Sequence, residues 1–155
     1  MLGIGFDIHR LAKNRKLVIG GVRIKHHKGL LGHSDADVLL HALIDAILGA
    51  AKAGDIGDMF PDTDPAYKDI SSVELLKRAL KTLGLKSVRH RVKEIDSIIF
   101  AQAPKLGRHK KAISRNIARL LGISPKLVNV KAKTMEGLGP IGGKNAIAAL
   151  VLAVI

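Results

Sequence analysis

The chain has 155 residues, with 26 Lys and Arg against 13 Asp and Glu, no cysteine, and a net charge of +13 at pH 7. This length suits a single domain over residues 1–155 with a full hydrophobic core, and the lack of cysteine excludes disulfides and thiolate metal sites. The charge favours anionic partners, but aromatic residues make up only 3% of the chain, which is poor material for stacking nucleic-acid bases. We therefore favour a solvated basic surface and expect no nucleic-acid partner.

The two ends of the chain predict a protein without membrane contacts. Met1 leads directly into a strand-like pattern, with none of the features of a signal peptide. The apolar run over residues 146–155 is too short to span a bilayer. We expect a cytoplasmic protein.

The N-terminal segment predicts a strand and a hairpin. Residues 3–9 alternate in polarity, which is typical of a half-buried strand. Asp7 and His9 then project from the same face, about 7 Å apart along the strand. Residues 17–19 and 22–24 flank Gly20-Gly21, which predicts a hairpin turn, and residues 25–32 predict a polar connection.

Residues 33–65 organise the rest of the chain. Ser34 and Asp35 are favourable N-cap residues, and they predict an almost wholly apolar helix that continues to about residue 52. One stripe differs, because Asp37, His41 and Asp45 are spaced i, i+4, i+8 and share one side of the helix. Four aspartates then crowd a loop rich in Gly and Pro: Asp55, Asp58, Asp62 and Asp64. This gathering of acids in a basic chain predicts a functional site.

The remaining chain alternates between helical and strand patterns. The predicted elements are a helix capped by Ser71 or Ser72 and ended by Gly84, a strand over residues 88–101 that is strongest over 95–100, a helix over 107–121 ended by Gly122, a strand over 127–133, a Gly-rich turn, and an Ala/Leu/Val helix over 145–154. This order predicts a two-layer α/β (α+β) fold with a mixed sheet and helices on one face. The other face of such a sheet would be bare, so we expect a homo-oligomer.

Asp7, His9 and His41 are the candidate metal ligands. One carboxylate and two imidazoles leave a fourth position open on Zn²⁺, as catalytic zinc needs. Such a site would polarise a phosphoryl or carbonyl oxygen. Taken alone, Asp7 and His9 fit a surface pair better than a metal site.

Five segments carry a resemblance to a known family. GFDIHR, IGGVRI, GLLGHSDADVLLHALIDAILGAAKAGDIGDMFPDTDP, AQAPK and VNVKAKTMEGLG together resemble the 2-C-methyl-D-erythritol 2,4-cyclodiphosphate synthases, in order and over essentially the whole chain. The resemblance implies cyclisation of 4-diphosphocytidyl-2-C-methyl-D-erythritol 2-phosphate with release of CMP. This reaction belongs to the non-mevalonate route to isoprenoid precursors.

The resemblance also assigns roles to residues. It implies Zn²⁺ on Asp7, His9 and His41, and Mg²⁺ or Mn²⁺ on Glu136 through the substrate diphosphate. His33 and Thr134 would stabilise the transition state, and Asp45 would support His41 or contact the substrate. The cytidine pocket would fall on residues 101–106. The substrate-binding residues implied are Asp7, His9, His33, Ser34, Asp55, Ile56, Gly57, Phe60, Pro61, Asp62, Thr63, Asp64, Ala101, Gln102, Ala103, Pro104, Lys105, Leu106, Lys133, Thr134 and Glu136.

The resemblance further implies a homotrimer with active sites between subunits and a central channel. The segment that lines this channel usually reads L-G-F-x-G-R-x-E in the family. Here Pro140 replaces the aromatic residue, Gly143 the arginine and Asn145 the glutamate. The residues are also compatible with two other functions. One is a nucleic-acid-binding module with an incidental acidic cluster, and the other is a nucleotide phosphohydrolase that uses zinc-bound water.

Overall fold

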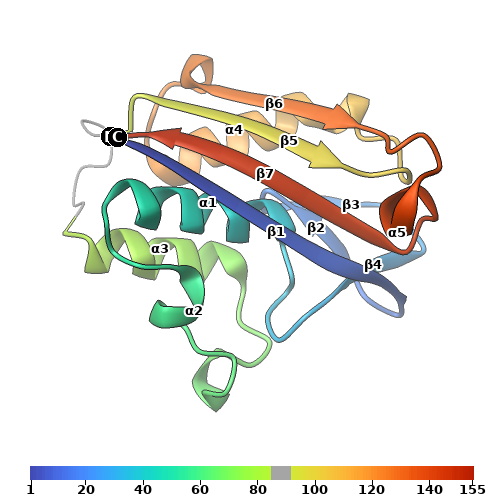
Figure 1. Cartoon of the computed structure of the whole chain (residues 1–155), viewed down its shortest axis with the longest axis horizontal. Coiled ribbons are helices and arrows are strands. Elements are labelled where there is room, and N and C mark those ends of the chain that lie inside the picture. Colours follow the sequence, from blue (N-terminus) through green and yellow to red (C-terminus); the bar gives the residue numbers. More distant parts are fainter. Residues whose placement is uncertain (85–91) are drawn as a thin grey trace.

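The computed structural model describes residues 1–84 and 92–155. Within them, one sheet contains β1 (Leu2–Lys13), β4 (Lys28–Leu31), β5 (Glu94–Phe100), β6 (Val128–Lys133) and β7 (Ala146–Val154), and a hairpin contains β2 (Leu17–Ile19) and β3 (Val22–Ile24). The helices are α1 (Val38–Ala50), α2 (Ile56–Met59), α3 (Ser72–Thr82), α4 (Lys110–Leu121) and α5 (Gly139–Gly142). The strand order is β4-β1-β7-β5-β6, in which only the described pair β5–β6 is parallel. Helices α1 and α4 pack on one side of this sheet and α3 packs against α1 (Figure 1), which confirms the predicted fold class.

Helix α1 approaches β1 closely because the strand presents two glycines to it. A Cβ atom added to Gly3 would lie 1.9 Å from the carbonyl oxygen of Ala46, and one added to Gly5 would lie 2.0 Å from that of Ala42. Any side chain at either position would therefore push the helix away from the sheet. Asp7 and His9 follow Gly5 on the same face, so this approach brings them to the side of α1.

The opposite face of β1 is apolar and exposed. The alternation predicted from the sequence is present, and Ile4, Phe6 and Ile8 share a face. Their exposed fractions are 63%, 55% and 45%. The sheet thus has one face covered by helices and another on which the described residues leave the apolar side chains of β1 exposed.

The predicted helix over residues 145–154 is wrong, because this segment is the central strand β7. It lies between β1 and β5 and packs against α1 through Ile147, Ala149 and Val151. The segment AIAALVLAV is apolar at every position, so it lacks the period of two that marks a half-buried strand. Without that period, its alanines and leucines favour helix in a propensity argument.

Other boundaries also differ from the sequence predictions. Helix α1 begins at Val38 with Asp37 as its N-cap, rather than after Ser34 and Asp35. The predicted polar connection contains the strand β4, whose partner is β1. Strand β5 begins at Glu94, and residues 88–91 of the predicted strand lie outside the described residues.

The turn and capping predictions are confirmed where they rest on local chemistry. Gly20 and Gly21 adopt positive φ angles of 61° and 71° between β2 and β3. Ser71 caps α3, and Gly122 ends α4 in the left-handed conformation. None of the helices in the described part of the chain combines the length and apolar character that a bilayer crossing requires.

Candidate active site

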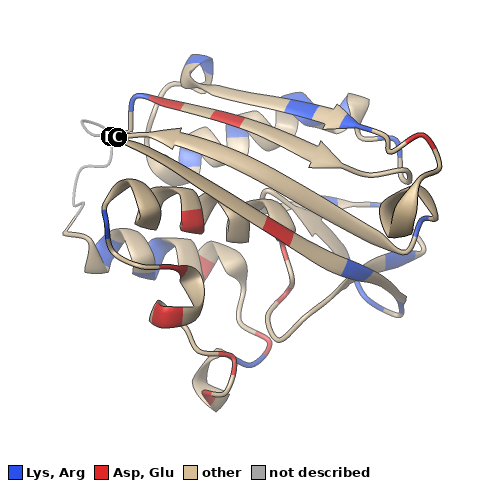
Figure 2. Cartoon of the chain, viewed as in Figure 1, with Lys and Arg blue, Asp and Glu red and all other residues tan. Residues whose placement is uncertain are grey.

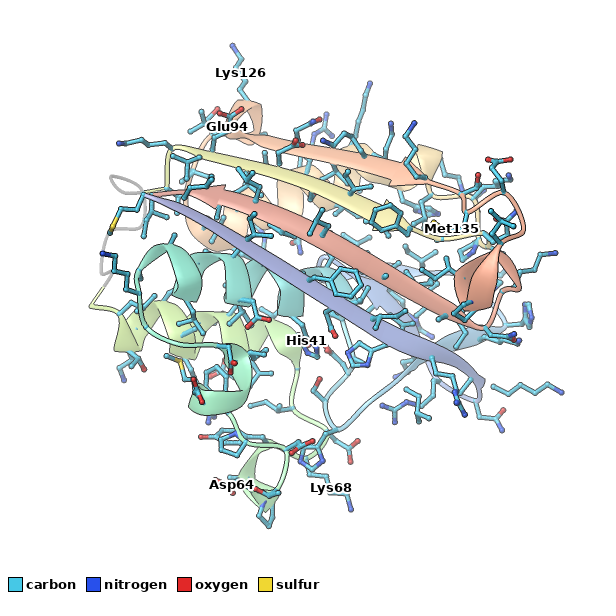
Figure 3. All side chains as sticks on the ribbon, viewed as in Figure 1. His41, Asp64, Lys68, Glu94, Lys126 and Met135 are labelled. Atoms are coloured by element: carbon cyan, nitrogen blue, oxygen red, sulfur yellow. The ribbon has the colours of Figure 1, made fainter. Side chains whose placement is uncertain are left out.

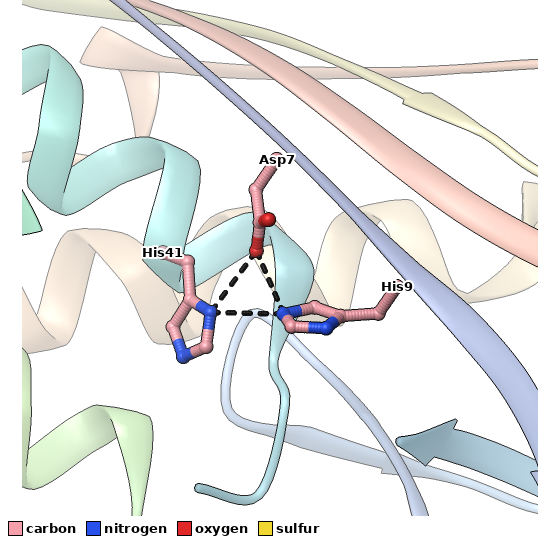
Figure 4. Close-up of side chains that lie close together, drawn as sticks. All are labelled: Asp7, His9 and His41. Atoms are coloured by element: carbon pink, nitrogen blue, oxygen red, sulfur yellow. Dashed lines mark hydrogen bonds and ion pairs between the residues drawn. The ribbon is translucent and has the colours of Figure 1, made fainter. Parts of the chain in front are cut away.

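Three predicted metal ligands meet between β1 and α1. Asp7 Oδ2 lies 2.9 Å from His9 Nε2 and 3.0 Å from His41 Nδ1, and the two imidazole nitrogens are 3.1 Å apart (Figure 4). Asp7 and His9 come from the helix-facing side of β1, and His41 comes from the first turns of α1. The three residues form a group that could hold a metal ion.

The outer nitrogen of each imidazole has its own partner. His9 Nδ1 lies 3.1 Å from the carbonyl oxygen of Leu31, which only accepts, so Nδ1 carries the hydrogen. His41 Nε2 lies 3.1 Å from Ser34 Oγ and 2.9 Å from Ser72 Oγ. The inner nitrogens can therefore present lone pairs to the same point as the Asp7 carboxylate, as metal ligation requires.

The pKa shifts of this group favour positive charge at its centre. Burial raises the pKa of Asp7, but hydrogen bonds from His41 and His9 outweigh it and hold the pKa well below its ordinary range. Burial lowers the pKa of His9, whereas the hydrogen bond and charge of Asp7 raise it, and the net shift is upward. A divalent ion would supply positive charge in the same place.

A cavity of about 390 Å³ opens beside the metal-binding group. Acidic residues of α1, α2 and the following loop lie in the same part of the ribbon (Figure 2). The predicted residues that line the cavity are His9, His33, Ser34, His41, Ile56, Gly57, Phe60, Pro61 and Asp62. Tyr67, Ile70 and Leu75, which the sequence did not point to, complete it with apolar surface.

The acidic loop is ordered by its own carboxylates. Asp55 caps α2 by accepting the backbone N–H of Asp58 at 2.9 Å. Asp64 caps the short 3₁₀ turn Pro65–Tyr67, and Asp62 and Thr63 lie exposed between the two caps. These caps hold the loop beside the cavity.

Asp45 supports the loop rather than His41. Its Oδ1 accepts the backbone N–H of Ile56 at 2.8 Å, whereas both nitrogens of His41 bond elsewhere. The expected hydrogen bond from Asp45 to His41 is therefore absent from the described contacts. Asp45 links the helix that carries His41, a candidate metal ligand, to the loop that lines the cavity.

Asp37, the first member of the predicted stripe, does not belong to the site. It is fully buried and caps α1 while accepting the backbone N–H groups of Gly20 and Gly21. Asp37 precedes His41 by four residues, but the helix begins one residue after Asp37. Its carboxylate therefore turns to the backbone instead of the cavity.

The remaining predicted residues form a second group. Ala101, Lys105, Leu106, Lys133 and Thr134 line a separate cavity of about 250 Å³ at the end of β5 and β6. Thr134 Oγ1 donates a hydrogen bond to Glu136, and Gln102 accepts the backbone N–H of Met135 at 3.3 Å. Ala103 and Pro104 lie in the same connection.

Within one chain the two groups stay apart. The two cavities share no lining residue. In Figure 3, His41 and Asp64 lie toward α1 and α2, whereas Met135 lies by the far end of the sheet. The structure therefore brings together the candidate metal ligands and the acidic loop, but not the residues at 101–106 and 133–136.

Three residues that the sequence did not assign to the site support it. Ser72 and Asp35 form a hydrogen-bonded pair behind His41. Arg15 donates to the carbonyl oxygens of Leu30 at 3.3 Å and Ser34 at 3.0 Å, which holds the segment that enters α1. A serine at a helix start predicts only a cap, so the sequence carried no signal for these contacts.

The fold and site define an α/β protein with two histidines and one carboxylate, a candidate metal-binding group, beside a ligand-sized cavity. A model of the YgbB family matches residues 1–155, and the chain belongs to that family. The 2-C-methyl-D-erythritol 2,4-cyclodiphosphate synthase of Bordetella avium (strain 197N) is 54% identical over 154 residues, which cover 99% of this chain and 94% of that protein. The resemblance predicted from the motifs is thus confirmed.

Solved structures give the same result. A CDP-bound 2C-methyl-D-erythritol-2,4-cyclodiphosphate synthase is similar with a TM-score of 0.88 and 33% identity, and the match covers 99% of both chains. The bifunctional IspDF from Campylobacter jejuni matches with a TM-score of 0.89 and 44% identity over 99% of this chain. The chain spans 42% of that bifunctional protein.

Proposed function

We propose that this chain converts 4-diphosphocytidyl-2-C-methyl-D-erythritol 2-phosphate to 2-C-methyl-D-erythritol 2,4-cyclodiphosphate and CMP, in the non-mevalonate route to isoprenoid precursors. The observation that carries the proposal is the convergence of Asp7, His9 and His41 at the edge of a cavity lined by His33, Ser34 and Asp62. The synthases similar to this chain and the CDP-bound structure support it.

The metal-binding group fits Zn²⁺. Nitrogen and carboxylate oxygen are ligands that zinc accepts, and three protein ligands leave a position for substrate. When bound there, zinc supplies Lewis-acid polarisation of a phosphoryl oxygen. Asp7, His9 and His41 hold the ion, and their outer hydrogen bonds keep the two imidazoles oriented.

The other residues position the two reacting phosphates. An oxygen of the 2-phosphate attacks the β-phosphorus, the bond from that phosphorus to the bridging oxygen breaks, and CMP leaves with that oxygen. Holding these groups in line and offsetting their charge supplies most of the catalysis in such transfers. His33 would stabilise the developing charge from one side. Thr134 would do so from the other, beside Glu136, which would hold Mg²⁺ or Mn²⁺ together with the phosphates.

We further propose a homotrimer in which each active site lies between neighbours. One chain would contribute the metal ligands and the acidic loop, and the next chain would contribute the cytidine pocket at residues 101–106. Two observations support this arrangement: the separation of the two cavities within one chain, and the exposed apolar face of β1 with Ile4 and Phe6. A sheet face of this kind is normally buried in an oligomer.

Phosphorus NMR with the methylerythritol substrate, Zn²⁺ and Mg²⁺ tests the function. A cyclic diphosphate together with CMP is the expected result. Open-chain phosphate products would favour the nucleotide phosphohydrolase instead. No turnover, with tight and salt-sensitive binding of RNA or DNA, would favour the nucleic-acid-binding module.

A further inference from the structure

The Nε2 atom of His41 faces two hydroxyl groups from different elements. Ser72, the first residue of α3, lies at 2.9 Å, and Ser34, which precedes α1, lies at 3.1 Å. Ser72 is fully buried, whereas Ser34 lines the cavity. The two serines therefore place a hydroxyl group next to His41 Nε2 on its buried side and another on the side of the cavity.

Ser72 is bound in one orientation by Asp35. Its hydroxyl donates to Asp35 Oδ1, and its backbone N–H donates to the same oxygen at 3.1 Å. The backbone N–H of Asp37 also approaches that oxygen, at 3.3 Å. An ionised carboxylate only accepts hydrogen bonds, so the Ser72 hydrogen is directed to Asp35 and away from His41.

This arrangement decides where the hydrogen of neutral His41 resides. Since the Ser72 hydroxyl hydrogen points to Asp35, its oxygen presents lone pairs to His41, and the contact with Ser72 is a hydrogen bond only when Nε2 donates. The lone pair of His41 then resides on Nδ1, which faces Asp7 Oδ2 at 3.0 Å and His9 Nε2 at 3.1 Å. In the other tautomer, Nδ1–H would occupy the position of the metal ion.

We propose that Ser72 and Asp35 are positioning residues that hold His41 in the Nε2–H tautomer, and thereby set the affinity of the site for a divalent metal ion. Ser34 has a different role. Its oxygen accepts the backbone N–H of Ala36 at 3.0 Å, and its hydroxyl hydrogen can turn toward a phosphate in the cavity. The proposal rests on the metal site and not on the cyclisation reaction.

The decisive experiment measures zinc affinity by competition with a chelator, starting from metal-free protein. Ser72→Ala should lower the affinity about tenfold or more, the range typical for loss of a group that orients a metal ligand. Asp35→Asn, which keeps the shape of the side chain but replaces the charged acceptor, should also lower the zinc affinity. It serves as the second variant if Ser72→Ala folds poorly.

Ser71→Ala is the matched control. Ser71 caps the same helix by accepting the backbone N–H of Val73 at 3.2 Å, but it is not a partner of His41. This variant should lower the melting temperature and leave zinc affinity within about twofold of wild type. An equal loss of zinc affinity in Ser71→Ala would show that α3 acts only through its stability, and would overturn the proposal.

Two further measurements separate the serines and observe the His41 hydrogen directly. Nitrogen–proton NMR of the zinc-loaded protein should find an Nε2–H at His41 that exchanges slowly with water in wild type, where Ser72 accepts it, and faster in Ser72→Ala. Ser34→Ala should raise KM while keeping zinc affinity. Unchanged hydrogen exchange and affinity in Ser72→Ala, or loss of zinc in Ser34→Ala alone, would overturn the assignment even if the synthase activity is confirmed.

Discussion

Asp37 Oδ2 accepts the backbone N–H of Gly21 at 2.6 Å, which fastens the start of α1 to the β2–β3 hairpin. Its other oxygen accepts from Gly20 at 2.8 Å and from the first turn of the helix. One buried carboxylate therefore satisfies several backbone donors and fixes where the helix that carries His41 begins.

We expect Asp37→Ala to lower the free energy of unfolding by about 3 kcal/mol, because it removes a helix cap and leaves buried N–H groups unpaired. Asp37→Asn should cost less, since one oxygen acceptor remains. Urea denaturation of both variants tests this. The folded fraction of each variant should bind zinc with the affinity of wild type. A variant that keeps its stability but no longer binds zinc would show that Asp37 belongs to the metal site.

His41→Ala should abolish zinc binding and nearly all activity while the fold is kept. The substitution leaves two protein ligands, and the His41 side chain borders the cavity, so its removal opens little enclosed space. Elemental analysis of purified protein, with circular dichroism for the fold, measures both effects. His26→Ala, which removes an imidazole outside the metal-binding group, is the control. Full zinc occupancy in His41→Ala would refute the ligand assignment.

Asp45→Ala should raise KM about tenfold and leave zinc content unchanged. The variant removes the acceptor of the Ile56 N–H at 2.8 Å, and a hydrogen bond to a charged group contributes about 1.5–3 kcal/mol to the placement of the loop. Steady-state kinetics with metal analysis checks this. Glu74→Ala, an exposed carboxylate on α3, should match wild type. An Asp45→Ala protein without zinc would mean that Asp45 acts on His41.

Ile4→Glu should dissociate the proposed trimer and abolish activity together with it. Ile4 is 63% exposed on the apolar face of β1, and a charge there would be buried without a partner if that face forms an interface. Light scattering at micromolar concentration measures the assembly. Leu127→Glu, on a short turn before β6, is the control for an exposed apolar residue elsewhere. A wild-type monomer with full activity would contradict the shared-site proposal.

The altered turn after Glu136 predicts weak binding of isoprenyl diphosphates. Pro140 and Asn145 line a hollow of about 570 Å³ near the start of β7, and Gly143 has no side chain to offer a diphosphate. Lysine, which follows at position 144, lacks the bidentate fork of arginine. Calorimetric titration with geranyl or farnesyl diphosphate, beside a homologue that keeps the arginine and phenylalanine, should find weaker binding here. Comparable affinities would show the prediction wrong, and synthase activity should persist in either case.

The turns, one helix cap, the first strand and the family of this protein could be predicted from its sequence. Gly20-Gly21 predicts the hairpin because both positions need positive φ angles, and Ser71 predicts the start of α3. The alternation after Gly3 placed Asp7 and His9 on one face, and the motifs identified His41 as their partner and the family as that of the synthases. These features depend on a few neighbouring residues or on a motif, so no knowledge of packing was needed.

Only the tertiary structure decided the features that depend on what each residue packs against. The segment at 146–154 is a strand because it lies between β1 and β5, whereas its alanines alone favour a helix. Asp35, Asp37 and Ser72 are common capping residues in sequence, and their separate roles follow from which backbone or imidazole group each one meets. Gly3 and Gly5 acquire their importance from the closeness of α1. The same alternation leaves Ile4 and Phe6 open on the far face of the sheet, because one layer of helices can cover only one side.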